Sequence, residues 1–513
     1  MNDVIFNKQQ GGLGRALPGS DYLSAMLFYS GTLPSGFTTT YNKKQIFAVS
    51  DAEALGILNT YADETAATGT YLITTKGNTG DTGTISITEP TITGIPIAVS
   101  LGTYTVGSAD TSIALQGAAW AAVINAGTIT HGYTAAFTTA TLTITARKGL
   151  GIALNTGTPI AVTPTGALAG TLTQFSGGVY SRQAIWHYHI SEYFRLQPQG
   201  NLWLGFYPVP GSYTYTELQD LQTFAQGSIR QALIYNDVAR TAANVAGDCT
   251  AIQAVNATLE ALHMPMSVMY AANIAAITDL STLTNLALLT ANKVSVCIAQ
   301  DGGAQGALLY LTSGISITTG GALLGAVSLA AVSEDIAWTA RFNISNGVEC
   351  DTIAFANGKL ITDPAITTNL LTQLDAYRYI FLKSFVDFTG SYFNDSHCAI
   401  AQSSDYAYIE NNRTIDKAIR TGRAALLPAL NSPIKFNADG TLTNITIADF
   451  TGRLNTAASA MIRAGEISAD GITIDPSQKA LTTSSIYITF QIIPNGVARN
   501  IIVNIGYTTA IAS

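Results

Sequence analysis

The sequence predicts a multidomain protein of α/β and α+β class, with a β-rich domain inserted into the first half of the chain. Three observations lead to this prediction. The chain has 513 residues, whereas single domains usually contain roughly 100–200. Hydrophobic residues make up 47% of the chain, which is enough for several cores. Segments with the two-residue period of strands also alternate with segments that have the period of about 3.6 residues typical of helices.

Changes in composition and periodicity divide the chain into four expected regions. They are an N-terminal arm, a discontinuous α/β core, an inserted Thr-rich β domain, and a compact α+β domain ending in a linking strand, with the bounds 1–20, 21–68 together with 179–404, 69–178, and 405–513.

The expected arm is interrupted by several glycines and has few apolar residues. Val4, Ile5 and Phe6 are apolar but isolated, so they cannot bury themselves locally. We therefore expect another part of an assembly to cover them.

The inserted region differs from the rest of the chain in composition. It is rich in threonine, and its few charged residues are Lys76, Asp81, Glu89, Asp110, Arg147 and Lys148. Residues 84–88 and 141–145 alternate between Thr or Ser and apolar side chains, which predicts half-buried strands. Between them, residues 111–126 have apolar side chains at helical spacing, with Asp110 or Thr111 as the expected N-cap.

The core region alternates predicted strands and helices. Residues 229–235 and 293–299 are short apolar runs of the kind that form buried parallel strands. A helix is expected around Ile252, Val255, Leu259 and Leu262, which share one helical face, with Asp248 or Thr250 at its start. This order of elements predicts a mostly parallel sheet flanked by helices.

Two further stretches of the core region give specific expectations. Asp363-Pro364 has the pattern of an N-cap followed by proline at the first helical position, which predicts a helix through Leu374. No charged residue lies between Gly302 and Ser333. Because Gly, Ser and Thr interrupt this stretch repeatedly, it is expected to be a buried part of the core and not a membrane span.

The last region is predicted to contain two helices followed by strands. The helices are expected at residues 411–430 and 446–464, and the strands at 485–493 and 497–508. Pro494-Asn495-Gly496 separates the two strands, and Asn-Gly between alternating apolar runs is the strongest short signal for a β-hairpin.

The charge content argues against a nucleic-acid-binding protein and favours a subunit of an assembly. Charged residues make up 11% of the chain, against roughly 25% in typical globular proteins. Surfaces poor in charge are often buried against other chains, which suits a subunit of a large assembly. With 25 Lys+Arg against 33 Asp+Glu and no basic block, we expect no nucleic acid partner.

Cysteine usage and the N-terminus predict where the chain is made. Cys249, Cys297, Cys350 and Cys398 are widely separated, so they read as small buried hydrophobic residues in a reducing compartment. The first residues have neither a basic start nor a continuous apolar run. We therefore expect a protein that is cytosolic when made, with no direct membrane insertion.

No motif predicts an enzyme or a cofactor. His187 and His189 would lie on one face of a predicted strand, near Glu192, but a metal site needs a third and usually a fourth ligand. We interpret this strand as aromatic-rich with hydrogen-bonded histidines, and keep a metal-dependent hydrolase as the alternative from another class. Asp301-Gly302-Gly303 lacks the spacing of a phosphate-binding loop and is predicted to be a plain surface turn.

One charged cluster is singled out in the last region. Its four cations would fall on one side of the predicted helix at residues 411–430, and they are Arg413, Lys417, Arg420 and Arg423. They form either an ordinary solvated face or a surface for an acidic protein partner.

Several segments outside the insert resemble the tail sheath proteins of contractile bacteriophages and related injection systems. The resemblance is carried by Asn2-Asp3-Val4-Ile5, by Gly11-Gly12-Leu13-Gly14-Arg15 with Leu17-Pro18-Gly19, by residues 188–195 with Gly200 and Leu202-Trp203, and by residues 408–418. The insert is similar to the Thr/Ala/Gly-rich modules of phage structural proteins, with Gly102-Thr103-Tyr104-Thr105-Val106 preceding the predicted helix. Such modules face outward.

The resemblance implies a structural protein and no enzyme. Sheath subunits polymerise as stacked hexameric rings around a tail tube and contract to drive the tube through the host envelope. The implied partners are other copies of the chain, the tail tube protein, and the baseplate and tail terminator proteins. The implied location is the tail sheath of a virion, with assembly in the host cytoplasm.

In sheath proteins, extended terminal segments add strands to a neighbouring subunit's sheet. In this chain the implied inter-subunit arm is Asn2, Asp3, Val4, Ile5 and Phe6, and the implied inter-subunit strand contains Val497, Ile501, Ile502, Val503 and Ile505. The four cations named above are the candidates to face the tube.

Two other functions remain open at this point. The first is another tail or baseplate component, although a tube subunit would be shorter and richer in strands. The second is a surface-binding protein whose Thr-rich domain holds carbohydrate, which the sparse aromatic residues of the insert (Tyr104, Trp120, Tyr133 and Phe137) support weakly.

Overall fold

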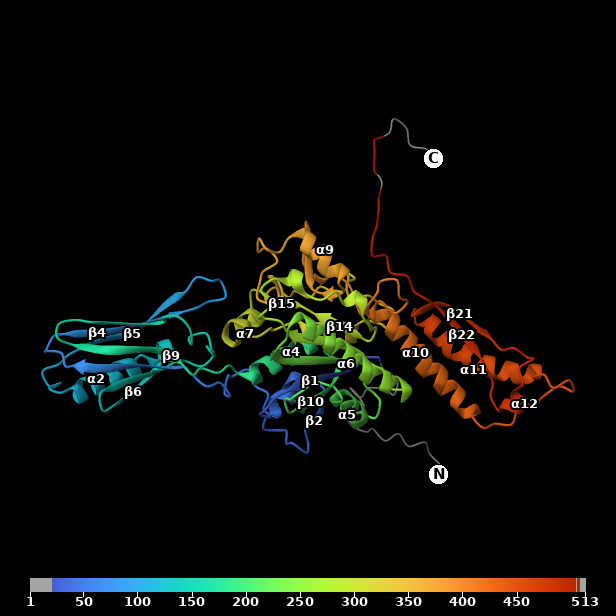
Figure 1. The fold of residues 1–513 in the computed structure, drawn as a ribbon, viewed down its shortest axis with the longest axis horizontal. Helices are drawn as coiled ribbons and strands as arrows, with labels where there is room; N and C mark the ends of the chain where they lie inside the picture. Colours follow the sequence, from blue (N-terminus) through green and yellow to red (C-terminus); the bar gives the residue numbers. More distant parts are fainter. Residues whose placement is uncertain (1–20, 504, 508–513) are drawn as a thin grey trace, which may run out of the picture. The chain divides into compact units, whose positions relative to one another are not determined.

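The computed structural model describes residues 21–503 and 505–507 and is drawn in Figure 1. The proposed arm residues Asn2–Phe6 lie outside the described residues. The chain divides into two units. The first contains residues 21–329 and 336–409, and the second contains residues 330–335 and those described from 410 onward.

A mixed sheet forms the centre of the first unit. All neighbouring strands are parallel except β10 and β2. In the order in which they are hydrogen-bonded, its strands are β17 (Tyr379–Ile380), β14 (Val294–Cys297), β12 (Ser267–Asn273), β11 (Gln231–Ala239), β1 (Leu23–Tyr29), β10 (Asn201–Tyr207) and β2 (Lys43–Ile46).

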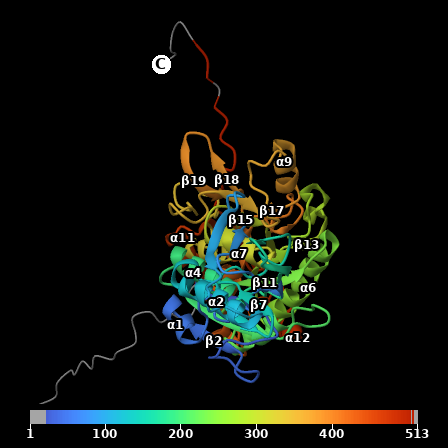
Figure 2. The ribbon, with the colours of Figure 1, turned by 90° about the vertical axis from the view of Figure 1, so that its left-hand side faces the viewer.

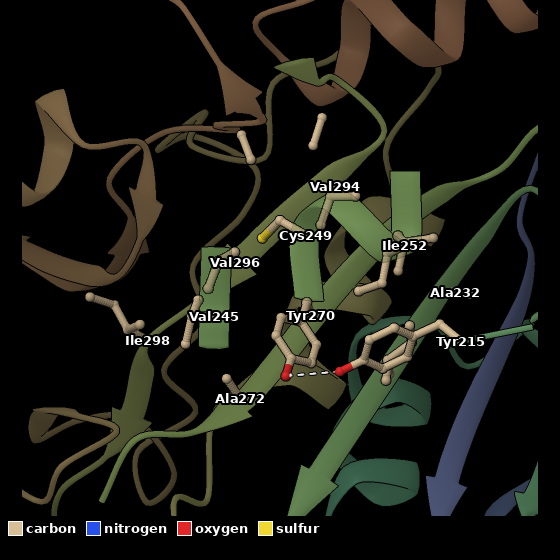
Figure 3. Close-up of a cluster of buried hydrophobic side chains, with 14 of the residues drawn as sticks. Tyr215, Ala232, Val245, Cys249, Ile252, Tyr270, Ala272, Val294, Val296 and Ile298 are labelled. Carbon is tan, nitrogen blue, oxygen red and sulfur yellow. Dashed lines mark hydrogen bonds between the residues drawn. The ribbon is translucent and has the colours of Figure 1, made fainter. Parts of the chain in front are cut away.

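Helices cover both faces of this sheet. Ala25 and Leu27 of β1 belong to a core shared with α5 (Glu217–Phe224) and α6 (Ala242–Ala261), part of which is shown in Figure 3. Phe28, which points to the other face because side chains alternate along a strand, packs against Trp186 of α4 (Arg182–Leu196). The predicted class, a mixed α/β protein with several sheets, is confirmed.

The stretch without charges between Gly302 and Ser333 forms two helices, α7 (Gln305–Ser313) and α8 (Gly320–Leu329). Gly320 through Ser328 are buried in α8, which contacts β11 and β12. Among the described residues, none of the helices combines the length and the apolar character needed to cross a bilayer.

The insert consists of two small sheets and helix α2 (Ile113–Ala126). Trp120 is at the centre of its core, with the rings of Tyr71 and Tyr104 against it. The sheets are β6 (Thr134–Thr138), β7 (Thr141–Thr145), β3 (Thr68–Thr75) and β9 (Ala169–Ser176), and β5 (Ile97–Thr105), β4 (Thr82–Glu89) and β8 (Ile160–Pro164).

Both alternating segments of the insert are strands, as predicted, but the helix cap differs. Ser112, and not Asp110 or Thr111, is the N-cap of α2, because its side chain accepts a hydrogen bond from the backbone nitrogen of Leu115 at 3.3 Å. The Asp110 carboxylate instead accepts from the backbone nitrogen of Gly107 at 2.9 Å.

Two helices in the core region also begin at other residues than predicted. In each case a threonine hydroxyl at a different position in the sequence caps the helix. Thr241 caps α6, ahead of the expected Asp248 or Thr250, and Thr367 caps α9 (Thr368–Ala376). Asp363 forms a turn before α9, where its carboxylate accepts from the backbone nitrogen of Ala365.

Shorter elements complete the first unit. They are α1 (Val49–Ala54), α3 (Thr128–His131), η1 (Leu280–Thr282), η2 (Leu286–Leu288), β13 (Thr290–Ala291), β15 (Ala299–Asp301), β16 (Ile353–Phe355), β18 (Leu382–Phe385), β19 (Phe388–Phe393) and β20 (Ala399–Ile400). Strands β18 and β19, labelled in Figure 2, form an antiparallel hairpin.

The second unit is built from two long helices and a two-stranded sheet. Ala418, Met461 and Ile467 form its core, with Phe490 and Ile492 packed against them. Its elements are α10 (Ile409–Leu426), η3 (Leu427–Ala429), α11 (Asn444–Arg463), β21 (Ile467–Thr473), α12 (Ala480–Thr483) and β22 (Thr489–Pro494).

The predicted hairpin around Asn495-Gly496 is wrong. The strand before it, β22, pairs with β21, and no strand is assigned to the described residues after Pro494. The side chain of Asn495 explains the difference. Its amide donates to the backbone oxygen of Gly465 at 2.5 Å and accepts from the Ser468 hydroxyl at 3.0 Å, so it binds the start of β21 and does not close a turn.

Candidate assembly surface

The two histidines singled out in the sequence lie on a helix and not on a strand. Ser181 begins α4 by accepting a hydrogen bond from the backbone nitrogen of Ala184 at 3.0 Å. Two residues apart on a helix, His187 and His189 point to different sides, so the prediction that they share one face is wrong. His187 is hydrogen-bonded to Glu53 at 3.0 Å and to Ser191 at 3.1 Å.

His189 is part of the core beneath the central sheet. Its ring lies 4.5 Å from the ring of Tyr235, and neither ring nitrogen has a hydrogen-bond partner among the residues that the structure describes. Desolvation by burial lowers its pKa to about 3, so the ring is neutral. The third candidate, Glu192, forms an ion pair with Arg195 at 2.6 Å. Within residues 21–503 and 505–507, no three His, Cys, Asp or Glu residues are grouped as metal ligands. His187, His189 and Glu192 therefore lie in separate environments and do not converge on the metal site considered from the sequence.

The glycine pair after Asp301 forms a bend in which Gly303 is exposed, as predicted, but Asp301 itself is fully buried. Its carboxylate accepts from the backbone nitrogens of Ala304 at 2.7 Å, Ala307 at 3.2 Å and Cys350 at 2.9 Å. Asp301 therefore holds the start of α7 against the loop that contains Cys350.

The place where an open α/β sheet usually binds ligands is filled by side chains. Such sites lie at the carboxyl ends of neighbouring strands whose connections run in opposite directions. Here these strands are β1, which leads to β10, and β11, which leads to β12. Beyond Tyr29, the last residue of β1, the ring of Tyr213 lies 4.9 Å away, and the Arg240 guanidinium stacks 4.1 Å above Tyr213.

Hydrogen bonds connect this packed group to the core beneath it. The hydroxyl of Tyr215 donates to that of Tyr270 at 3.2 Å (Figure 3). Tyr270 in turn donates to the Asp248 carboxylate at 2.5 Å, and Arg240 pairs with Asp248 at 3.0 Å. The hydroxyls of Tyr215 and Tyr270 are satisfied in this way, whereas the Tyr213 hydroxyl and the Nε and Nη2 atoms of Arg240 are buried without a hydrogen-bond partner among the described residues. The crevice is packed as part of the protein's core.

The four cations predicted on one face of α10 have different environments. Arg413 is 5% exposed and donates to the backbone oxygens of Ala330 and Ala331 at 3.1 and 3.2 Å. Lys417 forms an ion pair with Glu466. The interpretation of a single solvated face is therefore wrong for these two, because both serve the fold of the second unit. Arg420 is partly buried and Arg423 is exposed.

An apolar segment is exposed near the C-terminal end of the second unit. Ile501, Ile502, Val503 and Ile505 have exposed fractions of 80%, 86%, 76% and 95%, and Tyr507 is also fully exposed. We call residues 500–503 and 505–507 the projecting segment. Val497, predicted to belong to the same strand, is partly buried.

Sequence reasoning missed the residue that precedes this segment. Arg499 lies 2.6 Å from Glu410 and 3.1 Å from Asp335, and both carboxylates are buried. The available signal was a single cation next to an apolar run in a chain that is poor in charge.

The aromatic residues of the insert do not form a platform for carbohydrate. Trp120, Tyr104 and Tyr133 are buried in its core, and Phe137 packs against that core. The binding of sugars to protein usually uses exposed aromatic faces, which these residues do not offer.

The fold and surface define a mixed α/β protein of two units, the second of which carries an exposed apolar segment. The chain belongs to the DUF2586 family, whose N-terminal domain matches residues 1–397 and whose C-terminal domain matches residues 405–512. No curated protein matches the sequence.

Solved structures similar to this chain include sheath proteins of contractile injection systems. The helical sheath of the anti-feeding prophage in its contracted state is 15% identical, with 63% of this chain and 81% of that chain covered and a TM-score of 0.44. The contracted PVC sheath complex of an extracellular contractile injection system is 11% identical, with coverage of 63% and 80% and a TM-score of 0.42. A sheath tail protein from Listeria innocua is 9% identical, with coverage of 92% and 94% and a TM-score of 0.34.

Proposed function

We propose that this chain is a structural subunit of a contractile tail sheath. It polymerises as stacked hexameric rings around a tail tube, and contraction of the rings drives the tube through the host envelope. The observation that supports this most directly is the projecting segment, an exposed apolar stretch that follows a folded unit.

An exposed apolar segment of this kind needs a partner. Its backbone groups can pair with the edge of a sheet, and each hydrogen bond contributes about 1 kcal/mol net. Burying a large aliphatic side chain contributes roughly 1.5–3 kcal/mol more. The two-stranded sheet of β21 and β22 in another copy has edges that can accept such a strand. Repeated through a lattice, these contacts would give cohesion to a sheath.

The filled crevice supports a structural role over an enzymatic one. Tyr29, Tyr213 and Arg240 occupy the position where α/β sheets most often bind small molecules. The low charge content, 11%, agrees with surfaces that are buried between subunits.

The partners follow from the proposed sheath. They are other copies of the chain, the tail tube, the baseplate and the tail terminator, with assembly in the host cytoplasm and a final location in the virion. Residues Asn2–Phe6 would supply a second strand to a neighbour. Among the four candidate cations of α10, we propose Arg423 as the residue that faces the tube, because its side chain is exposed, whereas Arg413 and Lys417 are used inside the unit.

Electron microscopy of the purified full chain at high concentration tests this function. The wild type is expected to form tubes with sixfold symmetry. Ile501→Asp should abolish the tubes, because it places a charge where an apolar contact is proposed. Ile129→Asp, a change at an equally exposed isoleucine of the insert, should leave them intact.

The outcomes separate the parts of this proposal. Tubes formed by Ile501→Asp at the wild-type level would reject the role of the projecting segment. Single rings that never stack would indicate a baseplate component. A wild type that stays monomeric at every concentration and salt condition would reject the sheath function.

A further inference from the structure

A short stretch without assigned secondary structure joins β22 to the projecting segment. Along it, Asn495, Val497 and Arg499 are partly buried, whereas residues 496, 498 and 500 are exposed. This alternation indicates a chain that lies along the rest of the second unit with one row of side chains facing inward, and a hydrogen bond of 3.1 Å from the backbone nitrogen of Arg499 to the backbone oxygen of Val497 closes a tight turn at Ala498. We call residues 495–499 the docked segment.

Two side chains hold the ends of the docked segment. At its start, the Asn495 amide donates to the backbone oxygen of Gly465. At its end, the Arg499 guanidinium donates to Glu410 Oε1 at 2.6 Å and lies 3.1 Å from Asp335 Oδ2. Glu410 belongs to α10 and Asp335 to residues 330–335, so Arg499 joins two parts of the second unit.

The burial of the two carboxylates makes this contact specific. Glu410 is 2% exposed and Asp335 is 6% exposed, whereas Arg499 is reached from the surface. A buried carboxylate is stable only with a cation or several donors beside it, and a guanidinium can bind two such groups at once in a fixed geometry. Both contacts are made by Nη2 of the guanidinium, and lysine, which carries its ammonium group on a flexible stem without a planar group, is expected to hold the two carboxylates less rigidly.

We propose that Arg499 is the positioning residue that sets where the docked segment ends and the projecting segment begins. Arg499 thereby fixes the reach and direction of the strand that is offered to a neighbouring subunit. The role in assembly rests on the proposed sheath function, whereas the anchoring itself is a property of the single chain.

Loss of this anchor would lengthen the free segment at the end of the second unit. Without Arg499, the last anchor along the chain is Asn495, four residues earlier. At about 3.3 Å per extended residue, the free segment becomes longer by roughly 13 Å. A longer tether spreads its end over a larger volume and lowers its effective concentration at a neighbour's sheet edge.

Spin-label spectroscopy of the unassembled full chain tests the anchor. A nitroxide is attached at Ala498→Cys in the docked segment or at Tyr507→Cys in the projecting segment. The four native cysteines are buried, so the introduced thiol reacts preferentially. In the otherwise wild-type chain, the label at 498 should be several-fold slower in rotation than the label at 507.

Three substitutions then complete the test. Arg499→Ala should make the label at 498 as mobile as the label at 507, and Arg499→Lys should give an intermediate value. Arg463→Ala, which removes an exposed arginine from the end of α11, should change neither spectrum. If Arg499→Ala unfolds the unit by circular dichroism, Glu410→Gln replaces it, because that variant keeps the volume and weakens the same contact.

The proposal is overturned if the label at 498 has the same mobility in the wild type and in all folded variants. These spectra do not depend on polymerisation. A chain with the expected spectra but no tubes would therefore reject the sheath function and leave the anchor in place. Normal tubes with unchanged spectra in Arg499→Ala would reject the anchor alone.

Discussion

His189 and His187 show how differently two similar residues behave when they lie two positions apart on a helix. His187 reaches Glu53 and Ser191, so its polar atoms have partners. His189 faces the aromatic core beside Tyr235, and within the described part of the chain its ring nitrogens have no hydrogen-bond partner. Burial therefore keeps His189 neutral, which makes the folding of this unit depend on pH.

We predict that His189→Phe removes part of the loss of stability on acidification. The pKa of His189 is about 3 in the folded chain and about 6.5 when unfolded. Because the unfolded state binds the proton more readily, the wild type loses stability as pH falls from about 6.5 towards 3. Between pH 7 and pH 5 this contribution is about 2 kcal/mol.

Urea unfolding at pH 7 and at pH 5 measures this effect. The difference between the two pH values should be smaller in His189→Phe than in the wild type. His263→Phe serves as the control, because that histidine is exposed. The same pH dependence in all three proteins would contradict a buried neutral His189.

At the scale of the element, the insert behaves as a small two-sheet module with its own core. Trp120 is fully buried and contacts Tyr71 and Tyr104, which come from different sheets. Most of the charged groups of the insert are used inside it or at its base. Glu89 pairs with Arg147, and this contact lowers the pKa of the Glu89 carboxyl against the opposing effect of burial.

We predict that Trp120→Ala unfolds the insert while the central sheet stays folded. Replacing a buried tryptophan by alanine costs roughly 3–5 kcal/mol, a large part of the stability of a small module. Limited proteolysis should then cut within residues 69–178, and circular dichroism should lose only the signal of the insert. Ile129→Ala, at a fully exposed position, should be neutral. Simultaneous unfolding of the whole first unit would contradict this prediction.

At the scale of the whole molecule, the two ends of the insert leave the core side by side. Thr65 and Val179 exchange backbone hydrogen bonds of 3.1 and 2.9 Å. The insert also touches the core through the Glu64 carboxylate, which accepts from the backbone nitrogens of Gly149 and Gly151. A short connection can therefore bridge the gap.

We predict that the core folds and assembles when residues 69–178 are replaced by a short Gly/Ser linker, which also agrees with an outward position of the insert. The paired backbone at Thr65 and Val179 already holds the ends together, so the linker has little closure entropy to overcome. Circular dichroism should show the helices of the core, and electron microscopy should show narrower tubes. An unfolded product would show that the contacts around Glu64 are essential to the core.

Features that depend on the local pattern of residues could be predicted from the sequence alone. The alternation of Thr with Ile or Leu gave β4 and β7, and apolar residues at helical spacing gave α2, α6, α10 and α11. It also identified the apolar segment around Ile501, although the partner expected for it at residues 485–493 pairs with β21 instead. Strand and helix periods are properties of neighbouring residues, so these elements could be read directly.

Features that depend on contacts between distant residues could not be predicted from the sequence and are known only from the folded chain. Asn495 binds Gly465, thirty positions away, so the expected hairpin gave way to the pairing of β21 with β22. Arg413 is buried against Ala330, and Arg499 between Glu410 and Asp335, because folding brings these separate segments together. The aromatic run at 186–194 forms a helix, α4, and not the expected strand. Because α4 is buried almost throughout, its sequence has no period that distinguishes a helix from a strand.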